Sequence, residues 1–479
     1  MPLILGGSSA AAAAYSIDNS CRWNDGDSPY MHYTPGSTTS QVKWTYSLWV
    51  KLGDMASREC LLWASSDSGS SDYVEIQFKA DRTLNFQVKG DSGTTAGVLE
   101  PTRLFRDPGA WYHLVFVWDS ENASAGDRMK IYVNGTEETV FDTDNNPADG
   151  DLSPVLTISI ETDVGKQTGT THYFDGYLAE VALIDGQAYA ASEFGEFNAD
   201  SPTIWQPKDI SGLTFGTSGF YLDFEDSADL GNDVSGNGND LTEVNFAATD
   251  QMSDSPTNNF CTLTNLNASA SVTLHGGNNT AFGSSGSTSG NVSSTICPKS
   301  GKWYAEIKYR TVVSNYPRSG HYQINNDHFG RLQNSTVGAP GYKISEGQYS
   351  ASGELTTNNG STPSWGSAVS AGQILQYAVD CDNGATYIGV QGTWQDSGDP
   401  TSGASKTGAG WTWTPGPTFQ GISFGDSVYN GAYSDWNFGN PSYANTSDAA
   451  DENGYGKFEY APPTGYYALC TKNLAEFGG

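Results

Sequence analysis

Positively charged residues are scarce in this sequence. Only 16% of its 479 residues are charged, against a usual share of about 25%. The chain has 54 Asp and Glu against 23 Lys and Arg, which gives a net charge of −31. A surface this acidic repels phosphate backbones and anionic membranes. The composition therefore argues against nucleic acid and membranes as partners. Two explanations of the excess of acidic residues stay open: they keep the protein soluble in salty water, or some of their carboxylates hold Ca²⁺.

The sequence also lacks the cysteine spacings of a metal or redox site. It has no CxxC pair and no spacing typical of zinc; its six scattered cysteines are Cys21, Cys60, Cys261, Cys297, Cys381 and Cys470. Cys60 lies in the apolar run ECLLW, which suits a small buried hydrophobic residue. The even count allows disulfides but does not require them, so the redox state stays open.

Long hydrophobic runs are missing too, because none reaches the roughly 20 residues of a membrane-spanning helix. The start, MPLILGG, has no Lys or Arg before its apolar part, and Gly6 and Gly7 interrupt that part. It therefore differs from a secretory signal peptide, and we expect a chain made in the cytoplasm and kept whole. Residues 1–14 are interpreted as a docking segment, with fraying as the alternative. Its docking residues would be Leu3, Ile4 and Leu5.

Catalytic motifs are absent as well. The sequence has no HExxH, GxSxG or Walker-type loop. Glycan-cleaving enzymes use paired carboxylates, which on a sandwich strand would follow Glu-x-Asp-x-x-Glu. Glu75 stands alone in its strand, while Asp223 and Glu225 share a strand face without a third acidic partner. His113, in WYHLVFVWD, is interpreted as a packed structural histidine. The sequence therefore predicts a protein that is not an enzyme.

Glycine and aromatic residues are abundant instead. Glycine contributes 56 residues and aromatics 12% of the chain. Short aromatic and β-branched runs alternate with Gly, Asn, Asp and Pro, as is typical of all-β proteins. The run YLAEVALI (177–184) is apolar on both faces and predicts a central strand with strict alternation. YAASEF (189–194) predicts a short helix over the sandwich end. The predicted fold class is all-β, two antiparallel β-sandwich (jelly-roll) domains in tandem.

The order of the strand signals predicts the domain boundaries. After the docking segment we expect a first sandwich over 15–248, including a closing strand in 219–226. A polar stretch at 249–258 is interpreted as a linker, and a second sandwich follows over 259–479. Within it, the Ser/Gly-rich stretch 276–294 is interpreted as a long surface loop.

Both predicted sandwiches resemble known families. The first resembles a LamG, or concanavalin A-like, domain through YSLWVKL, WYHLVFVWD, MKIYVNGTEE and FDGYLAEVALIDGQAYAASEF. The second resembles a SPRY domain through KWYAEIKY, AVDCDNGATYIGVQGTW, WNFG and APPTGYYAL. Its style, with GTWQDSGDP after the hairpin, is similar to SPRY-type domains of phage and other viral structural proteins. The resemblance implies jelly-roll folds, but LamG domains occur in lectins, enzymes and adhesion modules, so it does not fix a function.

Two sets of residues are candidates for ligand binding. Aromatic rings in loop-like sequence beside polar residues suit sugars, although such rings also fill the ends of a core. These candidates are Trp394, Trp411, Trp413, Tyr429 and Tyr433. A loop rich in Asp and Asn offers the oxygen ligands that Ca²⁺ takes, although tight turns use the same residues. These candidates are Asp226, Asp229, Asp233, Asn237, Asn239 and Asp240.

Together these features predict a non-enzymatic viral structural protein, of phage type. It would be a fibre, spike or capsid-decorating adhesin on the virion surface, assembled in the host cytoplasm. We expect it to contact other virion proteins through its N-terminal segment, to recognise host surface glycans or particle subunits, and to form a homo-oligomer. A secreted or surface carbohydrate-binding lectin is the first alternative. A glycan-cleaving enzyme on the same fold is the second.

Overall fold

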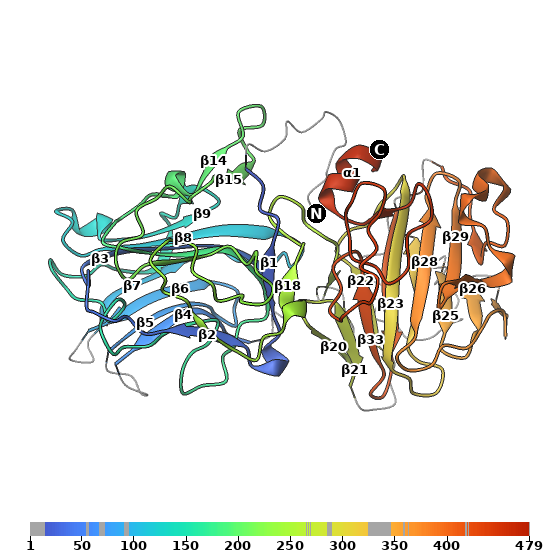
Figure 1. Cartoon of the computed structure of the whole chain (residues 1–479), viewed down its shortest axis with the longest axis horizontal. Coiled ribbons are helices and arrows are strands. Elements are labelled where there is room, and N and C mark those ends of the chain that lie inside the picture. Colours follow the sequence, from blue (N-terminus) through green and yellow to red (C-terminus); the bar gives the residue numbers. More distant parts are fainter. Residues whose placement is uncertain are drawn as a thin grey trace. The chain divides into compact units, whose positions relative to one another are not determined.

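The described part of the chain forms two compact units, which join between Thr257 and Asn258 (Figure 1). Each unit packs β-sheets face to face, so the predicted all-β fold of two sandwiches in tandem is confirmed. The predicted docking residues Leu3, Ile4 and Leu5 lie outside the described residues. The computed structural model describes residues 15–53, 57–66, 72–90, 95–264, 266, 268, 270–284, 290–323, 346–357, 360–362, 364–416, 419 and 421–478.

The first unit contains two antiparallel sheets and an added hairpin, β14 (Gly195–Phe197) with β15 (Trp205–Pro207). Sheet 1 has the order β10 (Thr136–Glu137), β9 (Met129–Val133), β8 (Trp111–Asp119), β3 (Lys43–Leu52), β13 (Gly176–Asp185), β1 (Ser20–Trp23) and β18 (Gln251–Met252), with β16 (Phe220–Leu222) also on β13. Sheet 2 has the order β11 (Phe141–Asn145), β7 (Thr95–Pro101), β6 (Leu84–Lys89), β5 (Tyr73–Phe78), β4 (Glu59–Ser65), β12 (Thr162–Val164), β2 (Tyr30–Tyr33) and β17 (Thr242–Val244).

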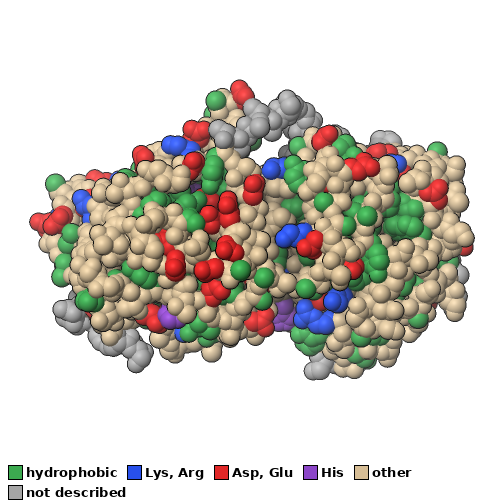
Figure 2. Space-filling model, viewed as in Figure 1, with side chains coloured by type: hydrophobic (Ala, Val, Ile, Leu, Met, Phe, Trp, Pro, Cys, Tyr) green, Lys and Arg blue, Asp and Glu red, His purple; other side chains and the backbone are tan. Residues whose placement is uncertain are grey.

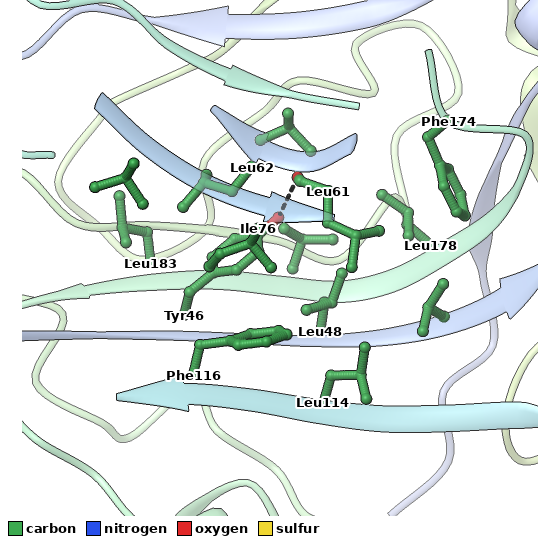
Figure 3. Close-up of a cluster of buried hydrophobic side chains, with 14 of the residues drawn as sticks. Tyr46, Leu48, Leu61, Leu62, Ile76, Leu114, Phe116, Phe174, Leu178 and Leu183 are labelled. Carbon is green, nitrogen blue, oxygen red and sulfur yellow. Dashed lines mark hydrogen bonds between the residues drawn. The ribbon is translucent and has the colours of Figure 1, made fainter. Parts of the chain in front are cut away.

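The inner faces of sheets 1 and 2 meet in one apolar core (Figure 3). Tyr46 and Leu48, two residues apart on β3, both point inward and pack with Leu62 and Ile76 of sheet 2. The Tyr46 hydroxyl donates to the Leu61 carbonyl at 3.1 Å, so its polar atom is satisfied inside the core. Each such side chain stabilises the fold by about 1.5–3 kcal/mol.

Connecting segments cover the outer face of sheet 1. The segment predicted as a short helix forms the 3-10 turn η3 (Ala191–Glu193). Ala191 and Phe194 pack there against Val115 of β8 and Ile184 of β13. The turn therefore covers a sheet face and not the end of the sandwich, because the outward residues of these strands are apolar too.

The central strand β13 is buried on both faces as predicted, but its alternation breaks at its middle. Leu178 and Val181 both face the inner core, although they are three residues apart. The register against β3 shifts between Ala179 and Ala182, and Glu180 takes a φ of 50°. This β-bulge makes the strict alternation predicted for the strand wrong.

Of residues 249–258, predicted as a linker, residues 249–257 are built into the first unit and Asn258 begins the second. Strand β18 pairs with β1 there, and Asp254 is fully buried. The Lys51 Nζ lies 2.7 Å from Asp254 Oδ2, and Trp111 Nε1 donates to Asp254 Oδ1 at 3.0 Å. The polar composition concealed this role because a charge pair, and not apolar burial, holds the segment.

The second unit also has two sheets, and its described α-helix is α1 (Thr471–Phe477). Sheet 3 has the order β19 (Leu263–Thr264), β22 (Gly290–Ser294), β32 (Ile422–Val428), β24 (Arg318–Gln323), β25 (Glu346–Ser350), β26 (Leu355–Thr357) and β27 (Gly360–Thr362). Sheet 4 has the order β20 (Val272–His275), β21 (Thr280–Gly283), β33 (Tyr433–Asn437), β23 (Lys302–Thr311), β28 (Ile374–Asp380), β29 (Ala385–Val390) and β30 (Thr393–Trp394), with β31 (Trp411–Thr412) on β29 and β34 (Tyr467–Ala468) on β23.

The stretch 276–294, predicted as a surface loop, contains strands β21 and β22. Small residues suit the tight approach of the chain here, since a Cβ on Gly283 would lie 2.5 Å from the Tyr429 backbone nitrogen. The Thr280 hydroxyl donates to Asp435 at 2.7 Å across the sheet. Packing and hydrogen bonds therefore override the loop-like composition. No helix in the described residues is long and apolar enough to cross a membrane.

Replacing Asp254 by Ala tests whether the buried ion pair holds residues 249–257 in place. The change removes the carboxylate that faces Lys51 and leaves a cation in a buried site. We expect the free energy of unfolding to fall by about 3–5 kcal/mol, measured by urea unfolding with tryptophan fluorescence. The control is Asp127→Ala, which breaks the Lys130–Asp127 pair (2.8 Å) at the surface and should cost far less, because solvent screens exposed pairs. Equal losses in both variants would contradict the assignment.

Candidate functional site

The outer face of sheet 2 carries a row of polar and aromatic side chains. The strand register places Trp63 of β4 between Asp163 of β12 and Glu75 of β5. His32 of β2 lies next to Asp163, and Gln87 of β6 lies next to Glu75. Residues directly opposite each other in antiparallel strands point to the same face, so these five side chains share one. We call these five residues the polar row.

The local sequence explains why the polar row faces outward. The neighbours of these residues in the chain, Leu62, Ile76, Phe86 and Val164, are all buried in the apolar core. A strand that turns such residues inward must turn the alternate residues to the opposite face. The core therefore positions the polar row through the backbone.

A stacked ring pair lies at the centre of this face. The Trp63 and Tyr73 rings are 4.8 Å apart at an interplanar angle of 21°. Trp63 is 5% exposed, whereas Tyr73 is half-buried. The Tyr73 hydroxyl donates to Gln87 Oε1 at 3.2 Å, and Lys89 Nζ lies 5.3 Å from the Tyr73 ring centre. A ring pair with an amide at the Tyr73 hydroxyl and an ammonium over the Tyr73 ring combines the apolar surface and the polar partners that sugar binding uses.

The two carboxyl groups of the polar row are held away from solvent. Burial raises the pKa of Asp163 to about 6; the Thr168 hydroxyl, which donates to this carboxyl, opposes that shift, and the neighbouring Glu161 adds to it. Burial likewise raises the pKa of Glu75, although the Asn85 amide donates to its Oε2 at 3.0 Å. Both groups hold protons more tightly than exposed carboxyls do.

Buried hydrogen-bond acceptors on this face lack a donor among the described residues. They are Asp163 Oδ1 and Gln77 Oε1, from residues that are each 1% exposed. A buried polar atom left without a partner costs about 1–3 kcal/mol. A hydroxyl group that reached them, from a ligand or from water, would recover part of that cost.

Sequence reasoning missed Glu161 and Asp163, although they follow the Glu-x-Asp spacing that it sought in other strands. The Glu161 side chain is 47% exposed and lies 2.9 Å from His32 Nδ1. Lys166 occupies the third acidic position of the pattern, and its Nζ lies 3.7 Å from the centre of the Tyr30 ring. The alternation within ETDV (161–164) was the signal that could have revealed the pair.

The predicted pair Asp223 and Glu225 does not share a strand face, so that prediction is wrong. Strand β16 ends at Leu222, and Phe224 takes a φ of 59°. The Glu225 backbone N–H donates to Asp223 Oδ1 at 3.0 Å, which closes a turn. The turn removes the alternation on which the prediction depended.

The predicted aromatic binding residues do not form one surface. Trp411 and Trp413 are 8% and 9% exposed and belong to the core of the second unit, so their assignment to a recognition surface is wrong. Trp394, Tyr429 and Tyr433 are half-buried. Trp394 lies on β30 at one edge of sheet 4, whereas Tyr433 begins β33 near the other edge.

The predicted calcium ligands fold into a hydrogen-bonded turn. Both oxygens of Asp233 are used: Oδ1 accepts from the Tyr221 backbone N–H at 2.9 Å, and Oδ2 accepts from the Asn239 backbone N–H at 2.8 Å. The Asn237 and Asn239 amides donate to Gly219 O at 2.9 and 2.8 Å. No group of three or more His, Cys, Asp or Glu in the described residues could hold a metal. The turn explanation therefore accounts for Asp233, Asn237 and Asn239, and calcium binding by the set Asp226, Asp229, Asp233, Asn237, Asn239 and Asp240 stays a prediction.

His113 has the structural role predicted for it. Trp205 Nε1 donates to His113 Nδ1 at 3.1 Å, which leaves the ring proton on Nε2, 3.0 Å from the Ser47 hydroxyl. Burial lowers the pKa of His113 to about 3, so the ring is neutral near pH 7.

A model of the concanavalin A-like lectin/glucanases superfamily matches residues 25–192. The match confirms the predicted concanavalin A-like character of the first unit, and it includes the whole polar row. A search of curated proteins found no match.

Solved structures with a similar fold include the SPRY domain of human HERC1, which is 13% identical (36% of this chain, 96% of that chain, TM-score 0.27). They also include domains LG4-5 of the mouse laminin alpha1 chain, at 9% identity (90% of each chain, TM-score 0.29). A third is a Ruminococcus gnavus sialidase CBM40 bound to α2,3 sialyllactose, at 12% identity (37% and 97%, TM-score 0.26). No conclusion about this protein rests on likenesses this weak.

Replacing Asp163 by Asn tests the desolvated carboxyl through the pH dependence of stability. The native carboxyl keeps its proton to about pH 6, whereas the unfolded chain loses it near pH ~4. The native state binds more protons between these values, so this carboxyl makes the free energy of unfolding fall as pH rises. We expect the stability of the wild type relative to Asp163→Asn to drop by up to about 3 kcal/mol from about pH 4 to about pH 7. Urea unfolding at several pH values measures this, and parallel curves for the two proteins would contradict it.

Proposed function

We propose that this protein is a non-enzymatic recognition protein that binds glycans on the outer face of sheet 2. The observation that carries the proposal is the buried acceptor Asp163 Oδ1, next to Trp63 in the strand register, together with the stacked rings of Trp63 and Tyr73. Sugars present hydroxyl donors next to apolar ring faces, which these two features complement. The match of this region to a lectin/glucanase superfamily supports the same ligand class.

The residues around Asp163 favour binding over cleavage. Glycoside hydrolysis needs two carboxyl groups that flank the scissile bond. Lys166 stands at the third acidic position of the strand pattern, and its ammonium lies over Tyr30. The Asp163 carboxyl is engaged by the Thr168 hydroxyl and by Glu161. The remaining acceptor, Asp163 Oδ1, has no donor among the described residues, which supports a role for Asp163 in accepting a hydrogen bond from a bound sugar.

We place this activity on the surface of a virion, in a fibre, spike or capsid-decorating adhesin assembled in the host cytoplasm as a homo-oligomer. The six cysteines support the cytoplasmic origin, since all are free thiols and all but Cys297 are buried. Disulfides are common in secreted proteins and rare in the reducing cytosol. A secreted or surface lectin is the second candidate, and the same superfamily match supports it.

Glycan binding can be tested with Asp163→Asn and Trp63→Ala in the full chain on a glycan array. We expect each to weaken binding at least about tenfold, or about 1.4 kcal/mol, because each removes one element of the site. Trp63→Phe keeps a ring and should retain more of the binding. Asp144→Asn, on exposed β11 of the same sheet, is the matched control and should bind like the wild type.

Two outcomes of this experiment would count against the proposal. If both variants bound glycans as tightly as the wild type, the glycan site would not lie on sheet 2. New reducing ends in a glycan incubated with the wild type, absent with Asp163→Asn, would make the protein a glycan-cleaving enzyme.

The virion placement has a separate test, immunogold labelling of purified particles from the source with an antibody against residues 258–479. Gold at the tail tip would support an adhesin, and gold over the head would support a decoration protein. Particles without gold would contradict the virion placement and favour the secreted lectin.

A further inference from the structure

The outer face of sheet 4 carries a cluster of aromatic rings capped by an arginine. Phe282 of β21 stacks on Tyr433 of β33, with ring centroids 4.4 Å apart and an interplanar angle of 30°. The His275 ring of β20 lies 6.3 Å from each of them. The Arg310 guanidinium of β23 lies 5.4 Å from the Tyr433 ring centre. We call these four residues the aromatic platform; they lie on neighbouring strands outside the region matched by the lectin/glucanase family.

The aromatic platform is accessible. All three rings are half-buried, and the Arg310 side chain is 51% exposed. Figure 2 shows basic atoms and a histidine gathered at the lower edge of the second unit, where Figure 1 labels β20 and β21. Rings that stay half-exposed keep part of their apolar surface available for a ligand such as the C–H side of a sugar ring.

Arg310 is held in one orientation with hydrogen-bond donors to spare. Its Nε and Nη2 donate to the buried carboxylate of Asp435 at 2.9 and 2.8 Å. A guanidinium has five N–H donors in a rigid plane, so this pairing uses two of them. The Nη1–Nη2 edge keeps the parallel pair of N–H groups that binds a second carboxylate in bidentate fashion.

The surroundings add positive charge to an otherwise acidic protein. Lys308 lies two residues before Arg310 on β23, with its Nζ 4.8 Å from the Tyr443 ring centre. At the turn before β33, Tyr429 contacts Tyr316 with centroids 5.2 Å apart, and the Arg318 guanidinium lies 5.3 Å from the Tyr316 ring centre. Both local carboxylates are already in ion pairs, Asp435 with Arg310 and Glu354 with Arg318. Three cations therefore face two carboxylates among these described residues, an excess of one positive charge in a chain of net charge −31.

We propose that the aromatic platform is a second ligand site, which binds an acidic glycan through a single carboxylate. The exposed parts of the Phe282 and Tyr433 rings would pack against the apolar side of a sugar, and the outer edge of Arg310 would bind the carboxylate. The site lies in the second unit and requires a charged ligand, so it stands independently of the site proposed on sheet 2.

The charge balance favours an isolated carboxylate over a dense polyanion. Rings and arginine together also suit single-stranded nucleic acid. A phosphate backbone or a heavily sulfated chain, however, carries its charges along its whole length and would meet repulsion from the acidic protein. A sugar with one carboxylate per two rings engages the local cations with little of that repulsion.

The test is isothermal titration of the full chain with a tetrasaccharide of alternating glucuronate and N-acetylglucosamine. Its carboxyl-reduced form, in which each glucuronate becomes glucose, is the matched neutral ligand. We expect the acidic form to bind at least about tenfold more tightly than the reduced form at low salt, and the difference to shrink at high salt because exposed charges are screened.

Arg310→Lys is the informative variant, because it keeps a cation beside Asp435 and removes the free pair of N–H groups. It should abolish the preference for the acidic form. Tyr433→Leu keeps an apolar contact for Phe282 but should weaken the binding of both the acidic and the reduced tetrasaccharide. The matched control is Arg103→Lys in the first unit, since Arg103 also pairs with a carboxylate, Glu138, and is 47% exposed. Thermal unfolding of each variant confirms that it is folded.

Several results would overturn the proposal. Equal affinity for the acidic and reduced forms would show that the platform does not recognise the carboxylate. If Arg310→Lys still preferred the acidic form to the reduced form, Arg310 would not be the residue that binds the carboxylate. Tighter binding of oligothymidylate than of the tetrasaccharide would make the platform a nucleic-acid site. A change in self-association of Tyr433→Leu without any change in sugar affinity would make it an interface between copies of the chain.

Discussion

The two-residue alternation of the β-strand determines where the sites of this protein can lie. A strand buries one set of side chains and presents the other, so each apolar residue in a core places its neighbours on the opposite face. In β4 the burial of Leu62 directs Trp63 outward, and in β12 the burial of Val164 directs Asp163 outward. The polar row and the aromatic platform are both consequences of core packing on the other side of a sheet.

The pairing of strands then determines which outward residues become neighbours, because it joins residues that are far apart in the chain. His32, Trp63, Glu75 and Asp163 come from four separate stretches, and only the register brings them into one row. Alternation within one strand can be read from a sequence, whereas register depends on which strands pair. For this reason the sequence predicted the sandwiches and their order but did not reveal the polar row.

The errors of prediction have the same physical origin. Composition indicates a linker at 249–258 and a loop at 276–294, yet Asp254 pairs with Lys51 and the small residues of β21 allow a close approach. A single bulge at Glu180 reverses the facing of half a strand. Trp411 and Trp413 lie in loop-like sequence but fill the core. Tertiary partners, which no local pattern shows, decided each of these cases.

Each unit begins and ends at neighbouring positions. In the first unit Ser20 of β1 pairs with Met252 of β18, and in the second Phe260 forms a bridge with Cys470. A domain with adjacent ends can be inserted into, or removed from, a longer chain without disturbing its neighbours. Each sandwich is therefore suited to exchange as a unit, and recombination could replace one while the other keeps its fold.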